Sequence, residues 1–161
     1  MGYIDNEKMV KELFNLYGHK VFAFILYLVG LDQDWAYDIC ADSFVEAIGM
    51  NLSPNESFLT KLISIAISKA RITKIMPEFG GLDFLQVSEA DKGALRIVLE
   101  AFCKLDFETK VILLLRDQMN LGYEKISNIM HKSEVDVKTK LVQARLLLRK
   151  EIENIFNSKT R

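Results

Sequence analysis

The sequence predicts an all-α protein, and two observations support this fold class. Apolar residues recur at helical spacing through nearly the whole chain, and no strand-like alternation bounded by turn residues is found. Half of the 161 residues are hydrophobic, whereas only 8 are Gly and 2 are Pro, which is typical of a folded, helix-rich protein. We expect two small helical domains joined by a linker.

Four helices are expected in the first domain, which we place at residues 1–76. The segment Asn51 to Asn55 contains Ser, Pro and Asn, and it has the composition of a turn that closes the third helix. The expected helices run approximately over Asn6 to Tyr17, Lys20 to Val29, Gln33 to Met50 and Glu56 to Ile75.

Residues 77–92 are expected to form the linker, because the helical period lapses there at Pro77, Gly80 and Gly81. The segment is too apolar for a purely flexible tether. We therefore expect part of it to dock on a domain or in the groove of a partner, through Phe79, Leu82, Phe84 and Leu85.

The second domain is placed at residues 93–161, with helices expected near 93–104, 107–118, 122–130 and 134–155. Ser133 and Asp136 fit a capping box at the start of the last helix, with Asp in place of the usual Glu or Gln. That helix has an apolar stripe at spacings of four, three and four residues, formed by Val137, Leu141, Ala144 and Leu148.

A short helix, a tight turn at His131 and Lys132, and a longer basic helix form the layout of a helix-turn-helix, whose second helix enters the major groove of DNA. We expect Lys138 and Lys140 near the groove and Arg145 and Arg149 near phosphates. The alternative is an amphipathic helix with an ordinary solvated basic face. The candidate DNA-binding residues are Lys132, Ser133, Lys138, Thr139, Lys140, Arg145 and Arg149.

Charge differs between the two halves of the chain. Residues 1–100 carry a net charge of −5 and residues 101–161 one of +4, which gives −1 in total. This asymmetry suggests two modules with different partners, the second able to approach phosphates.

Several other classes of function are disfavoured. Cys40 and Cys103 are far apart in apolar surroundings, so we expect reduced core thiols and neither disulfides nor zinc ligands. His19 and His131 lack partners at metal-ligand spacing, and Asp38 and Asp42 lack a third group for catalysis. The stretch from Val21 to Gly30 is too short to span a bilayer, and the first residues lack a signal pattern, so we expect a cytoplasmic location without membrane insertion.

The second half contains the segments Leu105, Lys110 to Asp117, Leu121 to Ser127, Val137 to Leu141 and Ala144 to Arg149. Together they resemble region four of extracytoplasmic-function (ECF) sigma factors, members of the sigma-70 family. Compared with that pattern, Asp106 replaces a common proline, His131 stands at a turn glycine, and Asp136 adds a negative charge.

The first half resembles region two of the same family, in two places. An acidic signature, which in this family meets the clamp helices of the polymerase, is matched by Asp32, Asp34, Ala36, Asp38, Asp42 and Phe44, with Ala41 where the family has glutamine. The segment Phe58 to Ala66 resembles the helix that reads and melts the promoter, with Ser64 and Ile65 in place of an arginine–asparagine pair. The resemblance implies a polymerase-binding site of Asp34, Asp38, Asp42 and Phe44.

The resemblance as a whole implies an alternative sigma factor that directs core RNA polymerase to specific promoters, with no catalysis and no cofactor of its own. The implied partners are core RNA polymerase, promoter DNA and an anti-sigma factor. Two alternatives stay open: a sigma-like mimic or adaptor that binds an anti-sigma factor or polymerase without opening promoters, and a helix-turn-helix transcriptional regulator whose first domain senses a ligand or dimerises.

Overall fold

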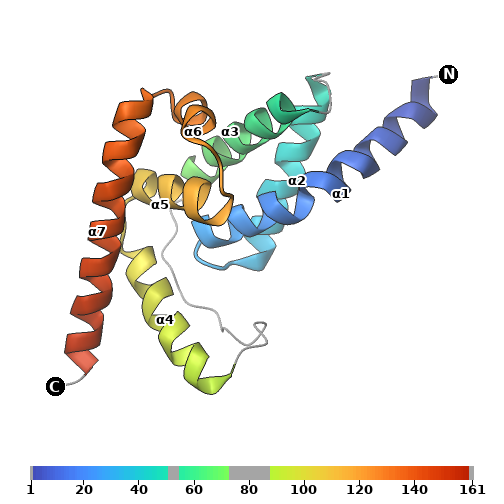
Figure 1. The fold of residues 1–161 in the computed structure, drawn as a ribbon. Helices are drawn as coiled ribbons and strands as arrows, with labels where there is room; N and C mark the ends of the chain where they lie inside the picture. The colour runs from blue at the N-terminus through green and yellow to red at the C-terminus, as the bar shows by residue number, and fades with distance from the viewer. Residues whose placement is uncertain (1, 51–54, 73–87, 160–161) are drawn as a thin grey trace.

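The computed structural model describes residues 2–50, 55–72 and 88–159, and every regular element in these ranges is helical (Figure 1). The predicted all-α class is confirmed. The elements are α1 (Gly2–Leu28), α2 (Gln33–Gly49), α3 (Glu56–Ile72), α4 (Glu89–Cys103), α5 (Phe107–Leu113), the π-helical turn η2 (Leu114–Gln118), α6 (Tyr123–Met130) and α7 (Glu134–Lys159).

The prediction of two helices before residue 30 is wrong, because α1 runs without a break through Gly18 and His19. Gly18 is buried, and a Cβ added to it would lie 3.3 Å from the ring of Phe14. The glycine therefore lets the Phe14 ring lie close to the helix backbone, from where it reaches Phe44 of α2, with ring centroids 5.3 Å apart. Glycine weakens a helix by about 1 kcal/mol relative to alanine, and this packing offsets that cost.

Helices α1, α2 and α3 pack around an aromatic centre. Phe44 lies 6.3 Å from Phe58 between ring centroids, and Tyr17 stacks on Phe58 at 6.0 Å. Ser43 is the buried polar side chain of this core, and its hydroxyl donates to the carbonyl of Ile39 at 2.6 Å. Because that bond satisfies the hydroxyl, its burial costs little.

The remaining helices are organised around α7. Helices α4, α5 and α6 all pack against it, on the side that buries the predicted stripe residues Val137, Leu141 and Ala144. Leu148 packs at the edge of the same core and is only partly buried.

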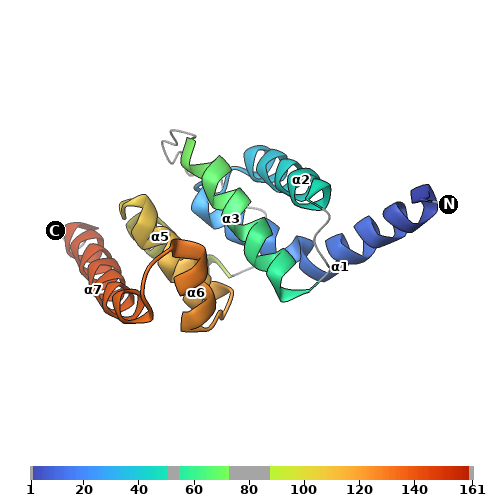
Figure 2. The same ribbon diagram turned by 90° about the horizontal axis from the view of Figure 1, so that it is seen from above.

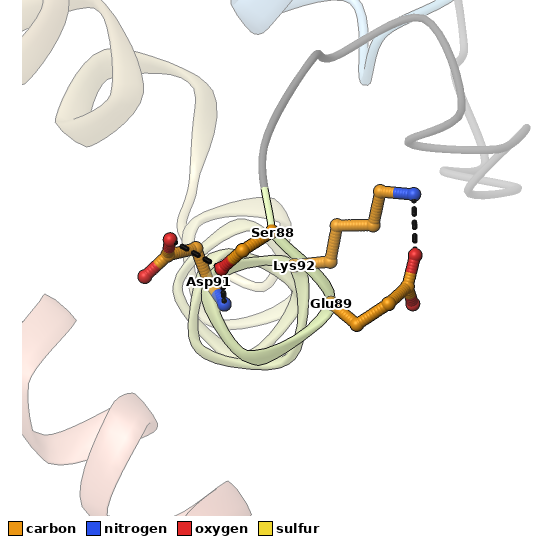
Figure 3. A network of polar contacts seen from close by, with 4 residues as sticks. All are labelled: Ser88, Glu89, Asp91 and Lys92. Carbon is orange, nitrogen blue, oxygen red and sulfur yellow. Dashed lines mark hydrogen bonds and ion pairs between the residues drawn. The ribbon is translucent and has the colours of Figure 1, made fainter.

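Helix α4 begins four residues earlier than expected, inside the predicted linker. Ser88 is its N-cap and accepts a hydrogen bond from the backbone N–H of Asp91 at 3.2 Å, while Glu89 pairs with Lys92 at 2.7 Å (Figure 3). An N-cap serine and acidic residues in the first turn are favourable signals for a helix start.

Residues 77–87 of the predicted linker and residues 51–54 of the predicted turn lie outside the described residues, and so does the expected helix end at Ile75. Helix α7 extends four residues beyond its predicted end at 155. The domain boundaries at 76/77 and 92/93 remain predictions.

The two groups of helices pack against each other, α3 against α6 and α1 against η2 and α5 (Figure 2). The guanidinium carbon of Arg71, near the end of α3, lies 5.1 Å from the ring centroid of Phe107 in α5. Buried residues of both groups belong to one continuous hydrophobic cluster. No helix in the described ranges is long and apolar enough to cross a membrane.

The cap of α7 gives a direct test of this local structure. Ser133→Ala removes the hydroxyl that accepts from the backbone N–H of Asp136, and loss of such a cap typically costs about 1 kcal/mol. We expect the free energy of unfolding, measured by urea denaturation, to fall by about that amount. Ser133→Asp, which retains a capping oxygen, should lose much less, and an equal loss in both variants would contradict the capping role.

Candidate nucleic-acid and protein interfaces

The turn between α6 and α7 is fixed by its own hydrogen bonds. His131 has φ 52° and ψ 47°, the left-handed conformation that glycine usually supplies. The backbone N–H of Lys132 donates to the carbonyl of Ser127 at 3.1 Å, and the Ser127 hydroxyl donates to the carbonyl of Lys132. These bonds fix the direction in which α7 leaves α6.

The predicted capping box at Ser133 is present in one of its two parts. The backbone N–H of Asp136 donates to Ser133 Oγ at 3.1 Å, as expected, but the Asp136 carboxylate accepts from the Ser133 hydroxyl at 2.7 Å instead of from its backbone. Aspartate is one methylene shorter than the usual glutamate, so it reaches only the hydroxyl. Ser133 is thus engaged in the cap within the free protein.

Two of the candidate DNA-binding lysines share one carboxylate. Lys132 Nζ and Lys140 Nζ each lie 3.8 Å from Oε2 of Glu108 in α5. Glu108 was not singled out from the sequence, because it lies far from both lysines along the chain. Its position between them lowers the net positive charge of this side of α7.

The other candidate cations are paired as well. Lys138 Nζ lies 4.0 Å from Glu134 and 5.0 Å from the ring centroid of Tyr123. Arg149 Nε donates to Glu153 Oε1 at 2.9 Å. Thr139, the remaining candidate in this stretch, is exposed.

Arg145 makes the most specific of these pairs, a two-bond contact with Asp117 in η2. This hydrogen-bonded carboxylate raises the pKa of Arg145 above its usual value. Asp117 and Arg145 are 28 residues apart, so the pair also ties η2 to α7. Arg145, predicted as a phosphate contact, therefore has an internal anionic partner in the free protein.

The outward face of α7 carries apolar side chains that the sequence analysis missed. Val135, Val142, Leu146 and Phe156 are 71%, 58%, 61% and 58% exposed. They fall on one helical face at intervals of seven, four and ten residues, a signal visible in the sequence.

The predicted polymerase-binding residues divide into an exposed and a buried set. Asp34, Asp38 and Asp42 are exposed along α2, whereas Phe44 is only 5% exposed and packs on Phe14 and Phe58. Phe44 thus has little surface to offer a partner and supports α2 from the core.

Beside the aspartates lies an apolar groove of about 380 Å³ between α1 and α2. Its walls include Phe14, Phe22, Tyr37 and Cys40, of which Phe14 and Tyr37 are well exposed. A groove with apolar walls, on a helix that also carries exposed aspartates, suits an amphipathic basic segment of a protein partner. Asp32, the first aspartate of the acidic signature, is the N-cap of α2 and accepts from the backbone N–H of Trp35 at 2.9 Å.

Ser64 and Ile65 occupy positions on α3 that offer little to DNA in this arrangement. Ile65 is 6% exposed, and the Ser64 hydroxyl donates to the carbonyl of Thr60 at 2.9 Å. Ser64 lines two clefts between α3 and α6, the larger of about 700 Å³, in which His131 also takes part. This face of α3 is therefore turned toward α6 and the turn at His131.

Among the described residues, no three His, Cys, Asp or Glu side chains gather as metal ligands would. Burial raises the pKa of the Cys40 thiol to about 11, and burial also raises the pKa of Cys103. Both thiols therefore stay protonated at neutral pH, and a protonated thiol is a poor nucleophile.

No protein-family model and no curated protein sequence matches this chain. The sigma factor RpoE of Bartonella quintana, solved in complex with the anti-sigma factor NepR, is similar in structure with a TM-score of 0.66 and 16% identity, over 91% of this chain and 98% of RpoE. The chain has a sigma-factor fold. CnrH, solved in complex with the cytosolic domain of CnrY, is also similar, with a TM-score of 0.71 and 18% identity over 92% of this chain and 90% of CnrH.

These matches extend over both groups of helices, because they include more than nine-tenths of the chain. The arrangement of the two groups is thus part of the shared sigma-factor fold. At this level of identity the likeness concerns the fold, and the function is inferred separately below.

The Arg145–Asp117 pair is accessible to a double-mutant cycle with Arg145→Ala, Asp117→Ala and the double variant. We expect a coupling free energy of about 0.5–1 kcal/mol at low salt, decreasing at high salt because the pair is exposed. Urea denaturation supplies the four free energies of unfolding. Arg149 and Glu153, an ordinary pair one helical turn apart, are the control and should couple by only about 0.3–0.5 kcal/mol. A coupling free energy of zero between Arg145 and Asp117 would contradict the tie between η2 and α7.

Proposed function

We propose that this chain is an alternative sigma factor of the ECF type, which directs core RNA polymerase to specific promoters. The observation that carries the proposal is the sigma-factor fold over nearly the whole chain, combined with a short helix, a tight turn and a longer helix that presents Lys138, Thr139 and Lys140. Residues 1–76 dock on the polymerase, residues 93–161 hold the upstream promoter element, and residues 77–92 connect them. The chain acts by binding and catalyses no reaction.

The N-terminal half of α7 can contact DNA in two ways. Its flanking cations suit phosphates, which provide affinity and register, and the exposed Val135 and Val142 suit the methyl groups of thymine, which provide sequence preference. Phosphates must replace the internal carboxylates of Glu108, Glu134 and Asp117 in these contacts. Exposed ion pairs are typically worth less than 1 kcal/mol, so this exchange is inexpensive.

The first group of helices offers the polymerase a different surface. Asp34, Asp38 and Asp42 form an acidic edge along α2, next to the apolar groove that includes Phe14 and Tyr37. A polymerase helix with basic and apolar residues is the proposed occupant, with Phe44 holding α2 in place from the core.

An anti-sigma factor is the second proposed protein partner. RpoE was solved with the anti-sigma factor NepR, and CnrH with the cytosolic domain of CnrY. A chain of the same fold is a reasonable target for a protein of this kind. The proposed function places the chain in the cytoplasm.

A sigma-like adaptor that binds polymerase or an anti-sigma factor without opening promoters is the second candidate. The burial of Ile65 and the position of Ser64 against α6 favour it, because neither side chain is placed to contact a DNA strand. The basic flanks of α7 favour the sigma factor. The helix-turn-helix regulator is less economical, because it assigns no role to the acidic edge of α2.

Transcription in vitro separates these candidates. We expect discrete start sites when the chain is mixed with core RNA polymerase from its host and a library of host DNA fragments. Lys138→Ala combined with Lys140→Ala should abolish them, because both cations flank the proposed groove contact. Lys159→Ala in the last turn of α7 is the matched control and should leave them unchanged. Polymerase binding without any transcripts would establish the adaptor instead.

Glu108→Gln tests whether the internal carboxylate competes with DNA. Removing its charge leaves Lys132 and Lys140 unneutralised, so we expect duplex DNA to bind several-fold more tightly, by about 0.5–1 kcal/mol. Every additional phosphate that these lysines neutralise should steepen the plot of log affinity against log salt by about 0.9. Fluorescence anisotropy at several salt concentrations measures both quantities.

Glu7→Gln makes the same change of charge on an exposed residue of α1, near the chain end that lies far from α7. It should have little effect on DNA binding. An equal increase in both variants would assign the tighter binding to net charge and not to the release of the two lysines.

A further inference from the structure

The exposed face of α7 continues past Lys138 and Lys140 into the C-terminal half of the helix. Four side chains in its C-terminal half lie along this face: Leu146, Arg149, Glu153 and Phe156, all well exposed. The chain's own core lies on another side of the helix, where Ala144 and Ile155 are buried and where Lys159 reaches Glu100 of α4 at 3.2 Å. Both views place α7 at an edge of the molecule (Figures 1 and 2).

The spacing of these four residues is the same in both directions along the chain. The intervals are three, four and three residues, which repeat the spacing of a helix–helix seam. The chemistry is complementary under the same reversal, because the two apolar residues are at the ends and the two opposite charges are in the middle. A second helix with the same sequence, running antiparallel, therefore matches this face residue by residue.

We propose that the C-terminal half of α7 pairs with α7 of a second copy of this chain, antiparallel and around a two-fold axis near Glu151. Leu146 of one copy then packs on Phe156 of the other, and Arg149 of one copy meets Glu153 of the other, each contact occurring twice. Such an interface is isologous, as in most homodimers. Each copy gives up the Arg149–Glu153 ion pair that it forms within its own helix, at 2.9 Å, so two pairs within helices are exchanged for two pairs between helices.

The parallel arrangement is disfavoured by the same charges. In register, it places Arg149 opposite Arg149 and Glu153 opposite Glu153, and like charges directly opposed are destabilising. Only the antiparallel arrangement satisfies both the apolar and the charged positions.

The area that the two copies of α7 bury against each other is small, so the dimer is expected to be weak. Residues 146–156 make about three helical turns, about 16 Å of helix, and two helices in contact over this length bury less than the roughly 1,200 Å² of a standard interface. We therefore expect weak self-association, with a Kd on the order of 10–100 µM. Arg149 lies in this contact and is also a candidate phosphate contact, whereas Lys138 and Lys140 lie outside it. Self-association is measured without DNA, so its test does not depend on the proposed DNA-binding function.

Sedimentation equilibrium of the full chain, over concentrations that bracket this Kd, is the first measurement. Arg149→Glu opposes two carboxylates across the seam, and Glu153→Arg opposes two cations, so each variant should raise the Kd at least tenfold. Lys8→Glu is the matched control: Lys8 is also an exposed cation paired one turn away, with Glu12 at 4.0 Å. It should leave the Kd unchanged.

Mixing the two variants provides the decisive step. A chain with Arg149→Glu and a chain with Glu153→Arg are complementary at both charged positions in the antiparallel pair, so the mixture should form a heterodimer although neither variant dimerises alone. This recovery cannot arise from damage to folding. Its failure would overturn the proposal, and so would a wild-type chain that stays monomeric throughout the concentration series.

Cross-linking tests the direction of the pair. A disulfide should form between a chain with Leu146→Cys and a chain with Phe156→Cys, identified by mass spectrometry of the cross-linked peptides. A preference for links between two copies of Leu146→Cys would overturn the antiparallel arrangement.

Discussion

The burial of one side of α7 is the constraint on which the second half of the structure depends. Val137, Leu141 and Ala144 are buried there, and α4, α5 and α6 all pack against α7. Helices α5 and α6 have seven and eight residues, too few to be stable as isolated helices in water. They form because α7 gives their apolar sides a surface on which to be buried, and the turn at His131 is positioned as a result.

This packing also decides the electrostatics of the proposed DNA-binding surface. The carboxylates of Glu108 and Asp117 are carried to the flanks of α7 by α5 and η2, where they meet lysines and an arginine distant in sequence. Burial of one large apolar side chain is worth about 1.5–3 kcal/mol, whereas an exposed ion pair is worth less than about 1 kcal/mol. The apolar core therefore fixes the backbone, and the ion pairs can exchange partners without unfolding it.

Features set by neighbouring residues were predictable from the sequence, and features set by distant residues were not. The short α6, the left-handed turn at His131 and the cap at Ser133 follow from local chemistry. The continuity of α1 through Gly18 depends on Phe14 packing onto Phe44 of another helix. Arg116 of the π-helical turn η2 donates to the carbonyl of Leu121 at 2.8 Å and packs on the ring of Tyr123. These contacts, like the position of Glu108 between two lysines, require the tertiary fold.

The departures of α3 from the sigma-factor pattern have a structural counterpart in the contact between α3 and α6. Ser64 is small, and its hydroxyl donates to a carbonyl of its own helix. The residue lines the clefts between α3 and α6. An arginine at this position would therefore project into the space beside α6. Ile65 contributes to the core instead. A DNA strand that used this face of α3 would have to separate α3 from α6. Promoter opening by this chain would therefore depend on the free energy of that separation as well as on the charges that α3 presents.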